Sequence, residues 1–202
     1  MPADNFVWFP DAAVGGLLTA NQQANQPKGE TGDKWFKPMS AFEVKSISFG
    51  VEMAHTIGSG TSGAAAGKAK FQPIKLVKDV DQGSCPLFAA CTAGAHFPSL
   101  YLAVRKTGGV NLVYLQYIFR MVFVTEIGWS GGEGEANPEE NISFVYGAMG
   151  MQYIKQKPDG SADATNTMVG LWSTVTNKNT WDVPGITGST PKFLTGADAQ
   201  QV

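Results

Sequence analysis

The sequence predicts a mainly β protein: an antiparallel β-barrel of two sheets with one short α-helix. The 202 residues include 24 glycines and 11 prolines, and such frequent turn residues are typical of all-β domains. Between these turns, most apolar residues follow the spacing of strands and not that of helices. A single stretch, 83–94, carries the start and stop signals of a helix. The remainder is therefore expected to be strand or loop.

The helix is expected over 83–94 because its two ends carry matching signals. Ser84 is the expected N-cap, since its hydroxyl can accept a hydrogen bond from a free amide of the first turn. Pro86 falls in that turn, where its missing N–H costs nothing. Gly94 can adopt the left-handed conformation that ends a helix. One apolar stripe on its surface means that the helix must lie on the β-structure as a plug or lid.

The two cysteines of the chain both fall in this helix. Cys85 and Cys91 are six residues apart, which places them on different sides of the helix and beyond disulfide reach. Both are expected to be buried as small apolar side chains. The sequence holds no C-x-x-C pair that would indicate redox chemistry.

Strands are expected in seven stretches between the loops. These are 5–9, 41–53, 69–80, 98–106, 112–128, 140–157 and 169–176. Long polar loops are expected at 20–34 and 54–68, within one domain that spans 1–181. A polar tail over 182–202 has little to pack and is expected to be partly disordered.

The strands at 112–128 and 140–157 are apolar on both sides. An antiparallel strand at the surface of a monomer normally keeps one polar side toward water. The helix can cover part of this second apolar side, and another subunit is expected to cover the rest. The pattern therefore predicts a permanent oligomer.

Composition argues against several classes of partner. The net charge is −2, and only 16% of the residues are charged. Lysines and arginines are scattered, so neither a nucleic-acid groove nor an anionic membrane surface is expected as the main partner. No apolar run approaches 18 residues, so no insertion into a membrane is expected. The start of the chain has no basic stretch followed by an apolar run, so no signal peptide is expected. The protein is expected to stay in the cytoplasm or to leave it in folded form.

No catalytic, cofactor-binding or metal site is expected. The stretch 58–63 matches G-x-G-x-x-G, but more loop follows it where a dinucleotide site requires a helix. His55 and His96 have no cluster of metal-ligating residues around them. A triad from Ser84 or Ser99 with Asp81 and His96 lacks any nucleophile motif, and the glutamates at 139–140 are expected to be solvated.

An ordered series of short motifs runs through 41–181. It consists of Phe42-Glu43-Val44-Lys45-Ser46-Ile47-Ser48-Phe49-Gly50, Ala66-Gly67-Lys68, Lys78-Asp79-Val80-Asp81, Cys91-Thr92-Ala93-Gly94-Ala95-His96, Leu102-Ala103-Val104-Arg105-Lys106-Thr107-Gly108-Gly109, Tyr114-Leu115, Gln156-Lys157-Pro158-Asp159-Gly160-Ser161, and Trp172 followed by Asn177-Lys178. In this order the series resembles the hemolysin-coregulated protein (Hcp) family, the tube protein of bacterial type VI secretion. The loop at 20–34 is longer than the family's, and the tail after Trp181 is extra.

The resemblance implies a structural protein with no cofactor and no turnover. Family members form homohexameric rings that stack into a tube, which a contractile sheath and baseplate propel from the cell with a spike protein at its tip. Small effector proteins travel in the lumen. The resemblance thus implies a cytoplasmic protein that is secreted on firing, to the medium or into a target cell.

The resemblance also assigns expected surfaces. Ser46 and Ser48 match the strand that lines the lumen, with a merely solvated strand as the alternative. Ring-stacking contacts are expected from a glycine-rich loop, a tight turn and a late segment, with flexible loops as the alternative. These residues are Gly58, Gly60, Gly63, Gly67, Gly108, Gly109, Thr174, Val175 and Thr176.

Two other functions remain open from the residues themselves. A related phage-like contractile injection machine would use the same tube fold. A monomeric ligand-binding β-barrel would need a closed apolar cavity and a polar exterior, which the two-sided apolar strands do not favour. An enzyme domain fused at the end is not expected, because 182–202 is too short to fold alone.

Overall fold

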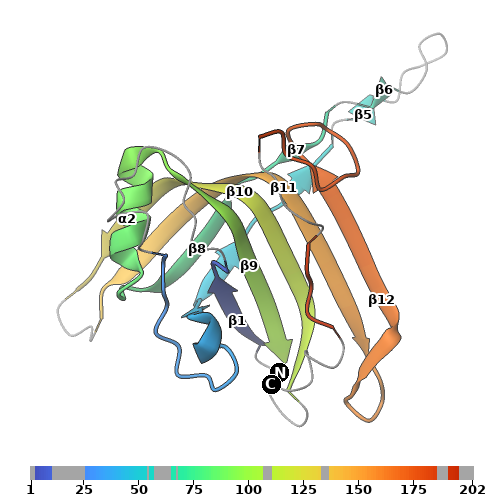
Figure 1. Cartoon of the computed structure of the whole chain (residues 1–202), viewed down its shortest axis with the longest axis horizontal. Helices are drawn as coiled ribbons and strands as arrows, with labels where there is room; N and C mark the ends of the chain where they lie inside the picture. The colour runs from blue at the N-terminus through green and yellow to red at the C-terminus, as the bar shows by residue number, and fades with distance from the viewer. Residues whose placement is uncertain are drawn as a thin grey trace.

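The computed structural model describes residues 3–10, 26–53, 55–56, 65–66, 68–106, 111–132, 137–185 and 191–195. These residues hold one α-helix, α2, against a large twisted sheet (Figure 1). The elements are β1 (Ala3–Trp8), the 3-10 helix η1 (Lys37–Met39), β2 (Phe42–Glu43), β3 (Ser46–Ser48), β4 (Val51–Glu52), β5 (His55–Thr56), β6 (Ala65–Ala66), β7 (Lys70–Phe71), β8 (Ile74–Asp79), α2 (Ser84–Ala93), β9 (His96–Lys106), β10 (Leu112–Ser130), β11 (Glu139–Gln156) and β12 (Ala162–Ser173). The expected mainly β fold with one helix is confirmed for this part of the chain.

The main sheet has eight antiparallel strands. Their order is β2-β1-β9-β10-β11-β8-β3, and β12 pairs with β11. β1 pairs with β9, which is far from it in the sequence: Ala3 lies opposite Lys106, and Trp8 lies opposite Tyr101. Two further ladders, β4 with β7 and β5 with β6, have two strands each.

The expected closed barrel of two sheets needs a correction. Among the described residues, the pairing follows an open path whose two ends, β2 and β3, belong to one run of chain, 42–48. The Val44 N–H donates to the Asn5 carbonyl at 3.0 Å, and the Lys45 N–H donates to the Val77 carbonyl at 2.8 Å. The run therefore crosses from β1 to β8, and this crossing takes the place of the last ladder of a closed barrel.

Several expected strands are divided or shifted. The stretch 41–53 pairs first with β1, then with β8 and then with β7, so it is divided into β2, β3 and β4. The stretch 69–80 breaks between Phe71 and Ile74, where Pro73 cannot donate a ladder hydrogen bond. The last strand begins at Ala162 and ends at Ser173, earlier at both ends than expected.

The apolar core lies on both faces of this sheet. Inside, α2 and the sheet enclose the largest cluster, which includes Phe97, Phe119 and Phe144. Outside, the segment 28–41 places Phe36 on β1, β9 and β10. Further along the outside, Trp181 and Val183 cover β10 and β11. Much of the second apolar side of the long strands is thus covered by the chain itself.

The two long strands exchange their inward sides halfway along. In β10, Phe119 points into the inner cluster, and three residues later Val122 does so too. Ile118 instead packs on the outside with Trp181. The change of side falls at Met121, which has a positive φ of 53°. Each side of the strand is therefore core over part of its length, which explains why the sequence is apolar on both.

The expectation that the tail has little to pack is wrong for 182–185 and 191–195. Val183 is buried, and Phe193 and Leu194 pack on the sheet. The Leu194 N–H donates to the Gln116 side-chain carbonyl at 2.8 Å, and the Gln116 amide donates back to the Leu194 carbonyl at 3.2 Å. The stretches 182–185 and 191–195 therefore form a strap, the tail strap, over the outside of β10 and β11. Within the part of the chain that is described, no helix has the length and apolar character needed to cross a membrane.

Candidate functional site

A polar surface follows four strands on the outside of the sheet. Ser48 lies opposite Lys75, Lys75 opposite Ser143, and Ser143 opposite Glu126. The next row across the same strands is Ser46, Val77, Asn141 and Gly128. We call these two rows the polar face. They line a shallow hollow of about 340 Å³.

Strand alternation produces the polar face. Ser46 and Ser48 are exposed, whereas Ile47 between them packs against the inner core. On β8, Ile74 and Leu76 are buried on either side of the exposed Lys75. The Ser143 hydroxyl donates to Glu126 at 3.2 Å. The polar face therefore presents serine hydroxyl groups, the amide of Asn141, one positive charge from Lys75 and one negative charge from Glu126. Such groups are suited to many weak polar contacts.

Ion pairs border the polar face at the end of β8. Lys45 Nζ lies 2.7 Å from Asp79 and 2.8 Å from Glu139, and all three side chains are about half exposed. Hydrogen bonds to Asp79 and then to Glu139 raise the pKa of the Lys45 ammonium group above its ordinary value. Two carboxylates share one cation here, so this border is net acidic.

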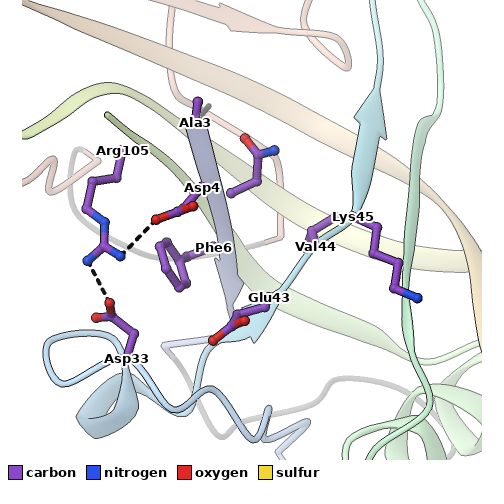
Figure 2. Close-up of a pocket in the computed structure, with 9 residues that line it drawn as sticks. Ala3, Asp4, Phe6, Asp33, Glu43, Val44, Lys45 and Arg105 are labelled. Atoms are coloured by element: carbon purple, nitrogen blue, oxygen red, sulfur yellow. Dashed lines mark hydrogen bonds and ion pairs between the residues drawn. The ribbon is translucent and has the colours of Figure 1, made fainter. Parts of the chain in front are cut away.

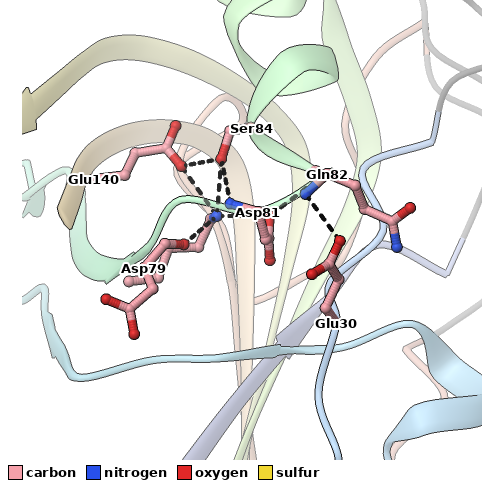
Figure 3. Close-up of polar contacts among 8 residues, drawn as sticks. Glu30, Asp79, Asp81, Gln82, Ser84 and Glu140 are labelled. Carbon is pink, nitrogen blue, oxygen red and sulfur yellow. Dashed lines mark hydrogen bonds and ion pairs between the residues drawn. The ribbon is translucent and has the colours of Figure 1, made fainter. Parts of the chain in front are cut away.

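The helix is fixed to the sheet by a buried polar cluster (Figure 3). Lys78 Nζ, with a side chain only 2% exposed, lies 3.0 Å from Glu140 and 2.9 Å from Asp81. The Ser84 hydroxyl donates to Glu140 at 2.6 Å. Burial raises the pKa of Asp81 above its ordinary value, against the lowering effect of Lys78. The cluster ties the first turn of α2 to β8 and β11.

Three sequence expectations are corrected by this cluster and helix. The N-cap of α2 is Gly83 and not Ser84. The Ser84 oxygen accepts hydrogen bonds from Lys78 Nζ and the Asp81 N–H, and its hydroxyl donates to Glu140. Glu140 is fully buried and not solvated. Cys85 is exposed and not buried, because the inner cluster takes Leu87 and Ala90 from the helix.

A second cluster holds the segment 28–41 in place (Figure 2). Arg105 lies 3.0 Å from Asp4 and 2.7 Å from Asp33, with the rings of Phe6 and Phe36 at 4.8 and 5.6 Å from its guanidinium. Burial raises the pKa of Asp33, but hydrogen bonds from the Phe36 N–H and from Arg105 outweigh it and hold that pKa below its ordinary value. The two terminal nitrogens of Arg105 pair with these carboxylates, while its buried Nε has no hydrogen-bond partner among the described residues. Asp4, Asp33 and Arg105 line a cleft of about 420 Å³.

The histidine and the serine considered for catalysis contact residues that belong to the packing of the fold. The ring of His96 lies 5.3 Å from that of Phe123. The Ser84 hydroxyl is engaged by Lys78 and Glu140. Within the described residues, no three potential metal ligands come together.

The expected stacking residues are divided between described and undescribed parts. Gly58, Gly60, Gly63, Gly67, Gly108 and Gly109 lie outside the described residues. The Thr174 hydroxyl donates to the Tyr146 and Gly147 carbonyls at 3.0 and 2.8 Å. The Thr176 N–H donates to Ser173 Oγ at 3.2 Å. These hydrogen bonds fix the segment at the end of β12, and Val175 between them is 51% exposed.

Sequence reasoning missed most of the polar face. Lys75, Glu126, Asn141 and Ser143 join Ser46 and Ser48 only through the strand order β10-β11-β8-β3. The alternation of apolar and polar residues at Ile74, Lys75 and Leu76 indicates that one side of this strand faces solvent. Which strand lay beside it could not be deduced from spacing alone.

Comparison with known proteins gives a consistent result. Residues 21–153 match the family model described as type VI secretion system effector, Hcp. Protein hcp1 of Pseudomonas aeruginosa is 33% identical over 97 residues, which cover 48% of this chain and 60% of that protein. The matched region thus spans about three fifths of that relative.

Solved structures share the fold over most of the chain. A type six secretion system protein with 27% identity matches with a TM-score of 0.73 and covers 88% of this chain and 99% of its own. Hcp1 from Salmonella typhimurium, 22% identical, matches with a TM-score of 0.64 over 89% of this chain and 100% of its own. The second likeness concerns the fold alone.

Proposed function

The chain belongs to the Hcp family of type VI secretion proteins, and on this premise we propose that it is a structural tube subunit that assembles into stacked homohexameric rings. The observation that carries the proposal is the polar face. Its two rows cover β3, β8, β11 and β10, and among the described residues no segment of the chain packs over them. A lumen wall needs such a surface, since it must stay wetted while the subunit is buried on other sides.

In this proposal the lumen is lined by Ser46 and Ser48 together with Lys75 and Asn141. Side chains of this kind make weak contacts with many proteins and hold none of them tightly. Small effector proteins would be retained inside the tube and released after firing. The subunit itself performs no turnover.

The two rims of the ring lie at opposite ends of the strands. Ser173 is level with Ala148, Arg120 and Ser99, and Lys106 lies seven residues further along β9. At about 3.3 Å per residue this separation is about 23 Å. The segment 174–176 would thus contact one neighbouring ring, and Gly108 and Gly109, which follow the end of β9 in the sequence, the other.

The remaining partners belong to the same machine. A spike protein would sit on the last ring, and a contractile sheath and baseplate would surround and launch the tube. The subunit would be made in the cytoplasm and leave the cell in folded form. Contact with nucleic acid or insertion into a membrane has no part in this function.

Light scattering coupled to size exclusion tests the proposal directly. The expected mass is six times the subunit mass of 21.5 kDa, and negative-stain images of the same peak should show open rings. A single peak at the mass of one subunit would contradict the tube function. It would favour a monomeric binding protein.

A further inference from the structure

Two exposed apolar surfaces remain at opposite sides of the molecule. The first protrudes: Phe88 of α2 and Trp129 near the end of β10 are 48% and 52% exposed, with ring centroids 6.0 Å apart. We call this pair the aromatic knob. The second is a hollow of about 320 Å³ lined mainly by Val51, Met53, Phe71, Met149, Met151 and Trp172. We call it the edge hollow. In Figure 1, α2 lies at the left of the molecule and β12, the strand that borders the edge hollow, lies at the right.

The edge hollow adjoins β12, whose outer edge carries no second ladder among the described residues, although Ser173 at its end bridges to Lys178. Among the described residues, β12 pairs only with β11. Its 164–173 stretch contains no charged residue and no proline, although these are the usual means of protecting an open edge. Met168 is 70% exposed at this edge. An open, apolar edge beside an apolar hollow is the signature of a covered interface.

The shape of the two surfaces indicates what covers them. Identical subunits that form a ring meet through two different surfaces, one from each neighbour. A protruding aromatic pair and a hollow on the opposite side of the same chain satisfy this requirement. Aromatic anchors seated in pockets are common centres of interfaces. Flexible methionines, such as Met53 and Met151, can adapt their shape to such an anchor.

Charge supports the same pairing. The strand ends beside the aromatic knob carry Asp79 and Glu139 against Lys45, a net negative set. The hairpin that lines the edge hollow carries Lys68 and Lys70 against Glu52, a net positive set. Opposite net charges on the two surfaces favour contact between unlike ends and oppose contact between like ends.

We propose that the aromatic knob of one subunit fills the edge hollow of the next subunit around the ring. The inference rests on the proposed ring and names the surfaces that build it. The occupant of the hollow is therefore a second copy of this chain. Contact runs in one direction, so every subunit uses both surfaces.

Substitution of one residue on each surface tests the inference. Trp129→Asp and Val51→Asp change side chains that are 52% and 57% exposed, so both variants should keep their circular dichroism spectra. Each is expected to raise the protein concentration needed for ring assembly at least tenfold. Asn179→Asp, also at an exposed position but on neither surface, is the control and should assemble like the unchanged protein.

The outcomes separate this inference from the proposed function. If the unchanged protein is monomeric, the proposed ring fails. If it forms rings and both folded variants still form them at the same concentration, the knob-to-hollow contact is wrong and the tube function stands. Rings that are lost with both variants and kept with Asn179→Asp support the contact.

Crosslinking tests the direction of the contact. In a background with Cys85→Ala and Cys91→Ala, Trp129→Cys and Val51→Cys place one thiol on each surface. A short bismaleimide should join a mixture of the two single-thiol chains into dimers only. A chain with both thiols should give a ladder that ends at six subunits. Dimers formed by Trp129→Cys alone would show contact between like ends and overturn the inference.

Discussion

Met121 and Gly147 face each other across β10 and β11 where both strands exchange their inward sides. A Cβ atom on Gly147 would lie 3.3 Å from the Cβ of Met121 and 3.2 Å from both methyl groups of Val183. The tail strap therefore approaches the sheet closely at this point. Glycine leaves the space that this close approach needs.

Gly147→Ala is expected to destabilise the fold by about 1–3 kcal/mol, because the added methyl group overpacks the contact with Val183. Urea denaturation followed by tryptophan fluorescence measures the change. Gly128→Ala, where an added Cβ meets nothing within 4 Å, should stay within about 0.5 kcal/mol. In a Val183→Ala background the cost of Gly147→Ala should shrink, and an unchanged cost would locate the crowding elsewhere.

Glu140→Gln is expected to cost about 3–5 kcal/mol, since it removes a buried carboxylate from a buried ammonium group. Lys78 would keep Asp81 alone as its ionic partner. The free energy of unfolding from urea denaturation measures this loss. Glu139→Gln is the neighbouring control; its partner Lys45 is half exposed, so the change should be about 0–1 kcal/mol. Equal effects of the two changes would contradict a special role for the buried cluster.

Acid should weaken the docking of the segment 28–41. The folded pKa of Asp33 is below its ordinary value of 3.8. The stability that this carboxylate contributes is therefore present above pH 3.8 and is lost as the pH falls through the lower, folded pKa. Unfolding free energies measured from pH 5 to pH 2.5 should fall less steeply in Asp33→Asn than in the unchanged protein. Parallel curves would mean that Asp33 contributes nothing to the acid sensitivity.

Phe193→Ala is expected to destabilise the protein by about 2 kcal/mol, because the ring is part of the outer cluster with Trp181 and Val183. Thermal unfolding followed by circular dichroism measures the effect. Lys192→Ala changes the exposed neighbour and should leave the melting temperature unchanged. A Phe193→Ala protein that melts at the unchanged temperature would show that the strap does not stabilise the sheet.

Ser48→Gln should leave ring assembly intact and lower effector retention several-fold, because a bulkier side chain fills the shallow hollow of the polar face. The measurement is the amount of effector that copurifies with the ring. Asn179→Gln, a polar and exposed position away from that face, is the control. Unchanged copurification with Ser48→Gln would remove this strand from the lumen.

Local signals predicted the helix and the long strands well. Gly94 ends α2 with a positive φ of 62°, as its position indicated. The expected stretches 112–128 and 140–157 correspond to β10 and β11 within two residues at each end. These elements are long or have their own end signals, so their sequences alone determine them.

Features that depend on distant partners were predicted poorly. Ser84 lies at the expected helix start, but Glu140, 56 residues away, takes its hydroxyl. The run 42–48 divides because β1 and β8 both compete for its backbone. The exchange of sides at Met121 has no local signal in the sequence. The apolar residues on the two sides of β10 and β11 belong to the inner and outer clusters of a single chain. In the sequence they looked like a surface that another subunit buries. The two-sided apolar pattern is therefore explained largely by packing within the chain. The exposed edge of β12 at Met168 is the part of the evidence for an oligomer that this packing does not explain.

The partnership of β1 with β9 has a consequence for synthesis. Residue 3 lies opposite residue 106, so the first strand is made long before its partner exists. At about 5–20 residues per second, the ribosome needs about 5–20 s to add the intervening hundred residues. Throughout that time β9 is missing, and among the strands that pair with β1 only the two-residue β2 has been made. The nascent chain must carry this apolar strand without its main partner, and the strap that completes the outer cover is made later still.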